Sequence, residues 1–314
     1  MESVQSAPVV LFGFARPETT ARVLERIVSA APEVLFLVQD APRPGRPDEA
    51  RRCDEVSRLF DQVTGIRTLH RIRTSSNMGL RERLLTGLDE VFQTVDRAII
   101  LEDDTLPSPS FFPFATELLE RYAGDSEVGS VSGNSFLFGR EASADSYFFS
   151  ADVRIWGWAT WARTWRDFRR NPVSTTWASE EVRAIVARLE SPWRRRALQQ
   201  MAASLDTLDT WDVQFVLHCI ARGWVQAMPR ENLVTNIGFG AGSTHTAFES
   251  YLDELPGGDL EFPLRHPETS SLTKGAGVVE YQALRTRLWR YPLRHPFDVA
   301  GRLLRYLRSK LRRG

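Results

Sequence analysis

The first hundred residues alternate short apolar runs with amphipathic segments of helical period, and this alternation constrains the fold more than any other feature. The apolar runs have the length of buried strands and lie at 9–14, 34–38 and 98–101, and 68–72 can form a further strand. The segments between them carry apolar residues on one helical face and lie at 18–30, 48–63 and 80–92. Strands alternating with helices predict an α/β domain whose central, mostly parallel sheet is flanked by helices.

The pattern changes after residue 128, where aromatic residues become dense. Helices are expected near 179–190, 193–205 and 211–222, followed by a strand at 224–228 and a glycine-rich loop at 236–246. We therefore divide the chain at 130 and at 275. The tail, 276–314, is predicted to be basic, amphipathic and helical.

Charge is balanced over the whole chain but not along it. Forty basic and forty acidic residues cancel, which argues against a nucleic-acid partner. Residues 283–314 nevertheless hold ten Arg or Lys and one acid, Asp298. Leucines and aromatics accompany them, so we expect 285–313 to contact an anionic membrane surface as an interfacial helix. A solvated helix or one packed in an oligomer is an equal alternative.

Targeting and redox features favour a cytoplasmic protein, with peripheral attachment to the inner membrane face through that tail. The N-terminus lacks the pattern of a secretory signal, and no run approaches eighteen apolar residues. Cys53 and Cys219 lie far apart among apolar residues, so buried reduced thiols are expected.

The most informative segment is Ile99–Asp104, an apolar strand that stops at three carboxylates, Glu102, Asp103 and Asp104. Adjacent buried carboxylates repel one another and are costly to desolvate unless a positive charge joins them. Mg²⁺ or Mn²⁺ is the natural compensation, because hard cations prefer oxygen ligands. The alternative is a solvated loop whose acids precede a helix starting near Ser110.

These residues and their surroundings resemble the A-type (GT-A) glycosyltransferase fold. Within it, the chain is most similar to the N-acetylglucosaminyltransferase I group and its bacterial family 2-like relatives. The resemblance covers roughly 8–245 and rests on segments in matching order: Val9–Arg26, Leu37–Asp40, Ile100–Phe112, Trp156–Trp158 and Trp211–Asp212. It implies a donor-binding half at 1–130 and an acceptor-binding, catalytic half at 131–275.

The resemblance also implies roles for residues on the donor side. Arg16 would contact the donor diphosphate, and Asp40 would hydrogen-bond the nucleotide base. Asp103 would face the ribose, Glu102 would lie near the donor sugar, and Asp104 would bind the metal. For each of Arg16 and Asp40 the alternative is structural: a surface arginine, and simple turn chemistry.

Two loops complete the predicted donor site. Asn77 and Gly79 permit a tight turn that would bring the backbone close to a nucleotide, although a helix cap explains them equally well. The loop at 236–246 resembles the mobile loop that closes over the donor diphosphate in many A-type enzymes. Its His245 is a candidate metal or phosphate ligand, with a structural or solvated role as the alternative.

On the acceptor side, the resemblance makes Asp212 the general base of an inverting displacement. A carboxylate can take the proton of an attacking hydroxyl, and the alternative is an acid stabilised at a helix N-terminus. The family has a second acid after this aspartate, whereas this chain has Val213 and Gln214. Trp156 or Trp158 is expected near the acceptor sugar, with Trp161 and Trp165 buried in the core.

The resulting hypothesis is a metal-dependent glycosyltransferase that moves a sugar from a nucleotide-diphosphate donor, a UDP-sugar above others, to a glycan, lipid-linked or protein acceptor. A sugar nucleotidyltransferase is an alternative, but the loop after the first strand has a single glycine, Gly13. The remaining alternative is a catalytically degenerate binding module. No P-loop sequence occurs, which excludes phosphotransferases of that class.

Overall fold

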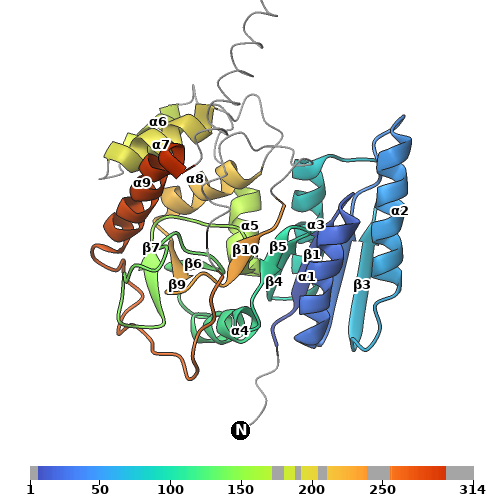
Figure 1. Ribbon diagram of the computed structural model, residues 1–314, viewed down its shortest axis with the longest axis horizontal. Coiled ribbons are helices and arrows are strands. Elements are labelled where there is room, and N and C mark those ends of the chain that lie inside the picture. Colours follow the sequence, from blue (N-terminus) through green and yellow to red (C-terminus); the bar gives the residue numbers. More distant parts are fainter. Residues whose placement is uncertain are drawn as a thin grey trace, which may run out of the picture.

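One eight-stranded sheet runs through the middle of the protein, which we describe from a computed structural model (Figure 1). The structure describes residues 6–171, 180–187, 192–203, 211–238, 255 and 257–294. The strand order across the sheet is β3-β2-β1-β4-β8-β6-β9-β7, and β10 pairs separately with β5. The strands are β1 (Val9–Gly13), β2 (Val34–Gln39), β3 (Thr68–Arg73), β4 (Arg97–Glu102), β5 (Thr105–Pro107), β6 (Val128–Ser132), β7 (Tyr147–Ser150), β8 (Trp158–Trp161), β9 (Val225–Pro229) and β10 (Val234–Asn236). The helices are α1 (Pro17–Ser29), α2 (Pro47–Asp61), α3 (Leu80–Thr94), α4 (Phe111–Arg121), α5 (Ala162–Arg170), α6 (Glu180–Ala187), α7 (Pro192–Ala203), α8 (Asp212–Arg222) and α9 (Ala276–Arg294).

The predicted alternation of strands and helices is confirmed in the first half of the chain. Strands β1 to β4 occupy the predicted positions, and each neighbouring pair among them is parallel. Helices α1 and α2 both begin with proline, whose fixed φ suits the first helical turn. Acidic residues in that turn, such as Glu18, favour the same start because they face the positive end of the helix dipole.

The second half adds four strands of mixed direction. Strand β8 is antiparallel to both β4 and β6, so β6 runs in the direction of β4. Strand β9 is parallel to β6, and the edge strand β7 is antiparallel to β9. Six of the eight strands therefore point the same way, which confirms the predicted mostly parallel sheet.

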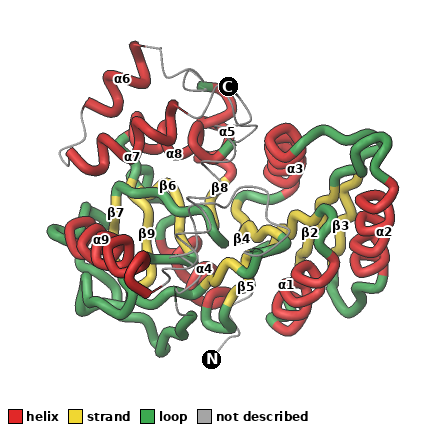
Figure 2. The backbone as a smooth tube through the Cα atoms, turned by 45° about the horizontal axis from the view of Figure 1, so that its top comes forward, coloured by secondary structure: helices red, strands yellow, loops and turns green. Residues whose placement is uncertain are grey.

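Helices cover both faces of the sheet (Figure 2). Alternate residues of each central strand point to opposite faces. On one face, Val9 and Leu11 of β1 pack with apolar residues of α1, α2 and α4. On the other, Val10 and Phe12 pack with those of α3, α5 and α8. Because both faces are buried, the central strands are apolar without alternation, as the sequence showed.

Helix α9 is part of the folded domain. Ala276 joins a small core cluster with Leu137, Phe148 and Met228, which places the start of the helix against strands β7 and β9. The carboxylate of Glu280 is buried and accepts a hydrogen bond from the Phe136 backbone N–H at 3.0 Å. The first part of the segment predicted as a tail therefore packs on the domain as α9, while 295–314 lie outside the described residues.

Three further expectations can be compared with the structure. The predicted division at 130 falls inside β6, so both halves build one sheet. Cys53 and Cys219 are buried free thiols, as predicted. Among the described residues, no helix is long and apolar enough to cross a membrane.

Candidate functional site

The carboxyl ends of β1 and β4 form the point of the sheet best suited to hold a ligand. The chain passes from β1 outward to β2 and β3, then returns to place β4 on the other side of β1. At such a switch point the two connecting loops diverge and leave a crevice beyond the strand ends. Residues 14–16 follow β1, and the three predicted carboxylates stand at the end of β4, so the fold brings these two segments together.

Arg16 and two of the carboxylates are in direct contact. The Phe14 backbone N–H donates to Asp103 Oδ2 at 3.1 Å, which ties the loop after β1 to the end of β4. Arg16 Nη1 lies 3.4 Å from Asp103 Oδ1, and the same nitrogen donates a short hydrogen bond to Asp104 Oδ2. Burial by itself lowers the pKa of the Arg16 guanidinium. The charges of Asp103 and Asp104 raise this pKa by more, so the net shift is upward and the arginine stays charged.

Negative charge exceeds positive charge in this crevice. Burial, and then the charges of Asp104 and Asp103, raise the pKa of the Glu102 carboxyl, and Arg16 offsets this in part. Burial followed by repulsion from Asp104 likewise raises the pKa of Asp103. Two carboxyl groups are thus held in an environment that disfavours their ionised form. Additional positive charge would relieve this cost.

A tight turn fixes the three carboxylates. The Glu102 N–H donates to Thr105 Oγ1 at 2.8 Å, and the Thr105 hydroxyl donates back to the Glu102 carbonyl at 3.0 Å. Strand β5 then pairs with β10, and the Ile237 N–H bonds the Asp104 carbonyl at 2.8 Å. The start of the predicted glycine-rich loop therefore lies against Asp104. His245, the predicted ligand in that loop, lies outside the described residues.

Gly238 makes the closest approach to the predicted metal ligand. A Cβ atom at this position would lie 2.4 Å from Asp104 Oδ2 and 2.8 Å from Asp104 Cβ. Both distances are shorter than real contacts allow, so the backbone can pass here because residue 238 has no side chain. The glycine at this position is therefore required by the Asp104 carboxylate.

Asp212 reaches the same crevice from the other half of the chain. It is the first residue of α8, and its Oδ1 accepts a hydrogen bond from the Val213 N–H at 2.8 Å. Its side chain is half-buried, and its charge helps to raise the pKa of Glu102. Gln214, at the second position after Asp212, faces α3, where its Oε1 lies 3.4 Å from Arg81 Nη2.

The structure corrects the role predicted for Asp40. Both carboxylate oxygens already accept hydrogen bonds, from the backbone N–H groups of Ala41, Met78 and Gly79 and from the side chains of Thr74 and Asn77, at 2.9–3.1 Å. Two oxygens offer about four acceptor sites, so none is open to a nucleotide base. Asp40 instead holds the loop before α3 and faces the positive end of that helix.

Asn77 shares this structural role. Its amide nitrogen donates to Asp40 Oδ2 at 3.0 Å and to the Ala41 carbonyl at 2.7 Å. Gly79 follows with a φ of 83° and is the residue before the first turn of α3. The turn-and-cap alternative for both Asp40 and Asn77 is therefore the one that the structure shows.

The tryptophans divide between buried and half-buried positions, and one prediction needs correction. Trp158 is 1% exposed and stacks on Trp211 at 5.6 Å between ring centroids, so it has no surface to offer a sugar. It is buried because β8 is an interior strand of the sheet. Trp156 is half-buried and meets Phe136 edge-on at 5.7 Å. Trp161 and Trp165 are buried, as predicted.

Sequence reasoning missed Arg83, in the first turn of α3. Its side chain is 7% exposed, and burial lowers its pKa while the charge of Asp40 partly restores it. Within the part of the chain that the structure describes, its Nε and Nη2 atoms find no hydrogen-bond partner. The nearby Gly87 gives no signal for Arg83, because a Cβ there would lie 2.9 Å from Phe12 and 3.0 Å from Val38, so that position is already packed.

A divalent cation fits this site by its chemistry, although the described residues alone do not enclose one. Among them, no group of three or more His, Cys, Asp or Glu side chains converges on a common point. Mg²⁺ commonly takes only one or two carboxylates, with waters and substrate phosphates completing its shell. Asp103 and Asp104 offer such carboxylates, and the excess of negative charge around Glu102 favours a cation.

Comparison with known proteins adds little to this geometry. Neither protein-family models nor curated protein sequences give a match. One of the solved structures that match is a UDP-glucose pyrophosphorylase complexed with UDP-glucose, at 12% sequence identity and a TM-score of 0.28. The match covers 62% of this chain and 87% of that one. At these values it carries no argument, so the class defined here is a mixed α/β protein with an acidic crevice at its strand ends.

Proposed function

We propose that this protein is a metal-dependent glycosyltransferase whose nucleotide-diphosphate sugar donor binds beyond the carboxyl ends of β1 and β4. One observation carries the proposal: Arg16 and three carboxylates meet at the switch point of the sheet, with Asp212 close enough to affect Glu102. One crevice thus contains a cation that can bind phosphate, oxygen ligands that can bind a metal, and a candidate base. Such a set suits the transfer of a group from a diphosphate.

Each residue has a distinct task in this proposal. Arg16 presents a planar guanidinium that can bind two phosphate oxygens at once. When this guanidinium leaves Asp104 and binds the donor, the Asp104 carboxylate becomes free. Asp212 accepts the proton of the acceptor hydroxyl as the hydroxyl oxygen bonds to the anomeric carbon. The bond from that carbon to the diphosphate breaks, and its electron pair leaves with the nucleoside diphosphate.

The metal belongs to the proposal through Asp104, with Asp103 beside it. A bound Mn²⁺ or Mg²⁺ would neutralise charge on the departing diphosphate. Arg16 remains able to hold the diphosphate from the opposite segment of the crevice. The resemblance to inverting enzymes supports Asp212 as base and UDP as nucleotide, and both remain proposals.

The acceptor side of the proposal rests on Trp156. Its half-buried ring lies in the segment that connects β7 and β8, and an aromatic face suits the apolar face of a sugar ring. A glycan or a lipid-linked saccharide is the proposed acceptor. Cytoplasmic location and contact with an anionic membrane through 285–313 remain predictions from the sequence.

A thermal-shift panel tests the proposal. Melting is measured with UDP, GDP, dTDP, CMP and ADP, each with Mn²⁺ and with EDTA. A ligand at about one hundred times its dissociation constant adds roughly 2.7 kcal/mol of stability, which is readily detected. One nucleotide should stabilise the protein with metal and not with EDTA. Asp104→Asn should lose that shift, and Asp54→Asn, which alters an exposed acid in α2, should keep it.

The outcomes separate the proposal from its alternatives. If no nucleotide shifts the melting temperature under either condition, the donor site does not exist and the proposal fails. Metal-dependent binding without release of the sugar, even with Asp212 intact, would identify a binding module. Formation of a nucleoside triphosphate and a sugar phosphate from the donor and pyrophosphate would identify a nucleotidyltransferase.

A further inference from the structure

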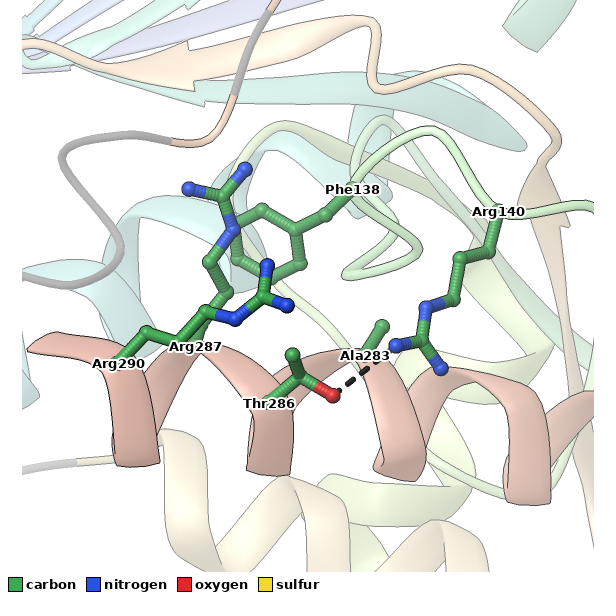
Figure 3. A pocket seen from close by; sticks show the side chains of 6 residues that line it. All are labelled: Phe138, Arg140, Ala283, Thr286, Arg287 and Arg290. Carbon is green, nitrogen blue, oxygen red and sulfur yellow. Dashed lines mark hydrogen bonds between the residues drawn. The ribbon is translucent and has the colours of Figure 1, made fainter.

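A second charged region lies on the far side of the β7 edge, between α9 and the turn after β6. A small pocket there is lined by Phe138, Arg140, Ala283, Thr286, Arg287 and Arg290 (Figure 3). Its volume is about 140 Å³. A water molecule accounts for roughly 30 Å³ of liquid, so the pocket holds the volume of four or five waters. That space suits a small polar group.

The charged side chains that line the pocket are all positive. Three of its six residues are arginines, and among the described residues that line the pocket there is no carboxylate. Arg287 and Arg290 project from α9, and Arg140 comes in from the facing turn (Figure 3). Guanidinium groups gathered around one opening attract an anion into the space between them. Arginine is also the side chain whose fork of donors best matches a phosphate group.

Arg140 and Arg287 are held in place by their neighbours. Arg140 Nη2 donates to Thr286 Oγ1 at 3.0 Å, and the Thr286 hydroxyl donates to the Gln282 carbonyl at 2.7 Å. The Arg287 guanidinium lies 5.0 Å from the centre of the Phe138 ring, within range of a cation–π contact. These contacts reduce the freedom that an anion would otherwise have to remove on binding.

The backbone conformation at residues 138 and 139 also shapes this pocket. Phe138 has a φ of 51° and Gly139 a φ of 78°, so two consecutive residues adopt the left-handed region. A phenylalanine is rarely found in that region, and the conformation costs about 1–3 kcal/mol. The turn directs the Phe138 ring over α9 and brings Arg140 to the same opening. On α9, Ala283, Thr286, Arg287 and Arg290 follow the spacing of one helical face.

We propose that this pocket, which we call the arginine pocket, binds a phosphate or diphosphate group, separately from the acidic crevice. Arg140, Arg287 and Arg290 supply the charge and the hydrogen-bond donors, Thr286 positions Arg140, and Phe138 forms an apolar wall. The group belongs either to a free anion or to the headgroup of a prenyl-linked molecule, for which the chemistry is the same. The proposal is independent of the glycosyltransferase proposal, because it requires neither metal nor nucleotide.

The location agrees with a site next to the predicted acceptor region. Phe136, two residues before Phe138, packs on Trp156 and receives the Arg154 guanidinium at 4.6 Å from its ring centre. Arg154 in turn lies 3.5 Å from Glu280 on α9. A short run of contacts therefore connects α9 and the arginine pocket to Trp156.

Calorimetric titration of the full chain with sodium pyrophosphate in EDTA tests the proposal. We expect saturable binding at one site. Arg140→Gln combined with Arg290→Gln should weaken binding at least about tenfold, because two charge-assisted contacts are lost. Arg285→Gln is the matched control, since this exposed arginine lies on the same helix outside the lining. Arg16→Gln is the second control and should leave binding in EDTA unchanged.

Each result bears on the proposal. Absence of binding by the wild-type chain at millimolar pyrophosphate would overturn it. So would binding that Arg16→Gln abolishes and the double variant preserves, because the anion would then occupy the acidic crevice. An unchanged melting temperature of the double variant without ligand verifies that lost binding is not lost folding.

Two further titrations identify the source of the phosphate. A water-soluble short-chain prenyl diphosphate that binds more tightly than pyrophosphate assigns the pocket to a lipid-linked molecule, and equal affinity assigns it to a free anion. Vesicles of phosphatidylglycerol carry diester phosphates and test diffuse attraction to a membrane. Binding to these vesicles, with none to pyrophosphate, would replace the pocket with a basic surface.

Discussion

The ends of β2 and β4 are alike in sequence and opposite in their electrostatics. Each strand is apolar and finishes at acidic residues on the same edge of the sheet. At the end of β2, Asp40 receives hydrogen bonds from five different donor groups and is satisfied. At the end of β4, Arg16 faces a cluster in which burial and repulsion raise the pKa of Glu102 and Asp103.

The difference separates an acid whose oxygens are already hydrogen-bonded from acids that are crowded by like charge. A buried carboxylate stabilises a fold when the surrounding donors satisfy it, as at Asp40. It costs stability when like charges gather around it, as at Glu102. Because folding gains nothing from such crowding, the end of β4 is the place where a bound cation or cationic group would have the largest effect.

The largest effect that tests this comparison is expected at β2. Asp40→Ala leaves several buried N–H groups without an acceptor, at a cost of about 3–4 kcal/mol in the free energy of unfolding. Urea unfolding measures it, with Asp54→Ala as an exposed control in α2. A variant of normal stability that loses nucleotide binding would contradict the comparison and restore the nucleotide base as the partner of Asp40.

The next effect is expected at Gly238, beside the end of β4. Gly238→Ala places a methyl group against Asp104, which Arg16 holds in position, so the carboxylate or the backbone must move. Overpacking of this kind costs about 2 kcal/mol. We also expect weaker metal-dependent binding of the nucleotide, measured by the same thermal shift.

Gly277→Ala is the matched control for Gly238→Ala. A Cβ at Gly277 has no atom within 4 Å, and the residue lies in α9, where alanine is the better helix former. Its stability should be unchanged or slightly higher. Equal melting and equal binding in both glycine variants would show that Asp104 is free to move, contrary to the geometry described here.

Local patterns in the sequence were sufficient for the first half of the fold. Strands β1 to β4 and helices α1 to α3 follow from patterns of apolar residues, and β1 to β3 also pair with strands next to them in the sequence. Strand β6 was missed, since its partner β9 is about a hundred residues away and its sequence contains Gly129 and two serines. Such pairing depends on tertiary context more than on propensity.

The sequence indicated which segments meet beyond the strand ends, but it could not indicate every contact that they make there. Sequence placed Arg16, Glu102, Asp103 and Asp104 around one crevice, and the structure joins them. It could not distinguish Asp40 from Asp103, because the distinction comes from residues 74–79, which the fold brings to Asp40. Nor could helical spacing reveal that Trp158 belongs to an interior strand.

A smaller effect concerns pH. The folded-state pKa of Glu102 lies above its unfolded value near 4.3, so between the two values the folded protein binds a proton that the unfolded chain does not. Stability in EDTA is therefore greatest below the unfolded pKa and falls as pH rises through the folded pKa. Glu102→Gln should reduce this loss of stability with rising pH by about 1 kcal/mol, and Asp54→Asn should leave the loss unchanged.

Urea unfolding at a series of pH values from 4 to 9 measures the slope. An identical slope in wild type and Glu102→Gln would mean that Glu102 is ionised at no cost, and the contrast between the two strand ends would disappear. A slope of opposite sign would mean that the folded state lowers the carboxyl pKa, as expected of acids that are already satisfied.

The smallest effect on stability is expected for Arg83, whose surroundings share one feature with each of the two strand ends. It is a buried cation near a satisfied acid, and two of its nitrogen atoms find no partner among the described residues. Arg83→Met keeps a long side chain and removes a guanidinium that is costly to bury, so stability should change by less than about 1 kcal/mol. Nucleotide affinity should fall about tenfold if those nitrogens serve the donor phosphates.

Stability and binding together decide the role of Arg83. Arg22→Met, in the exposed part of α1, is the control and should alter neither. A loss of 3 kcal/mol or more in Arg83→Met, within the range of about 3–5 kcal/mol for a broken buried pair, would show that Arg83 neutralises Asp40. The end of β2 would then depend on charge as the end of β4 does. Unchanged stability with weakened binding would instead make Arg83 a cation reserved for the donor.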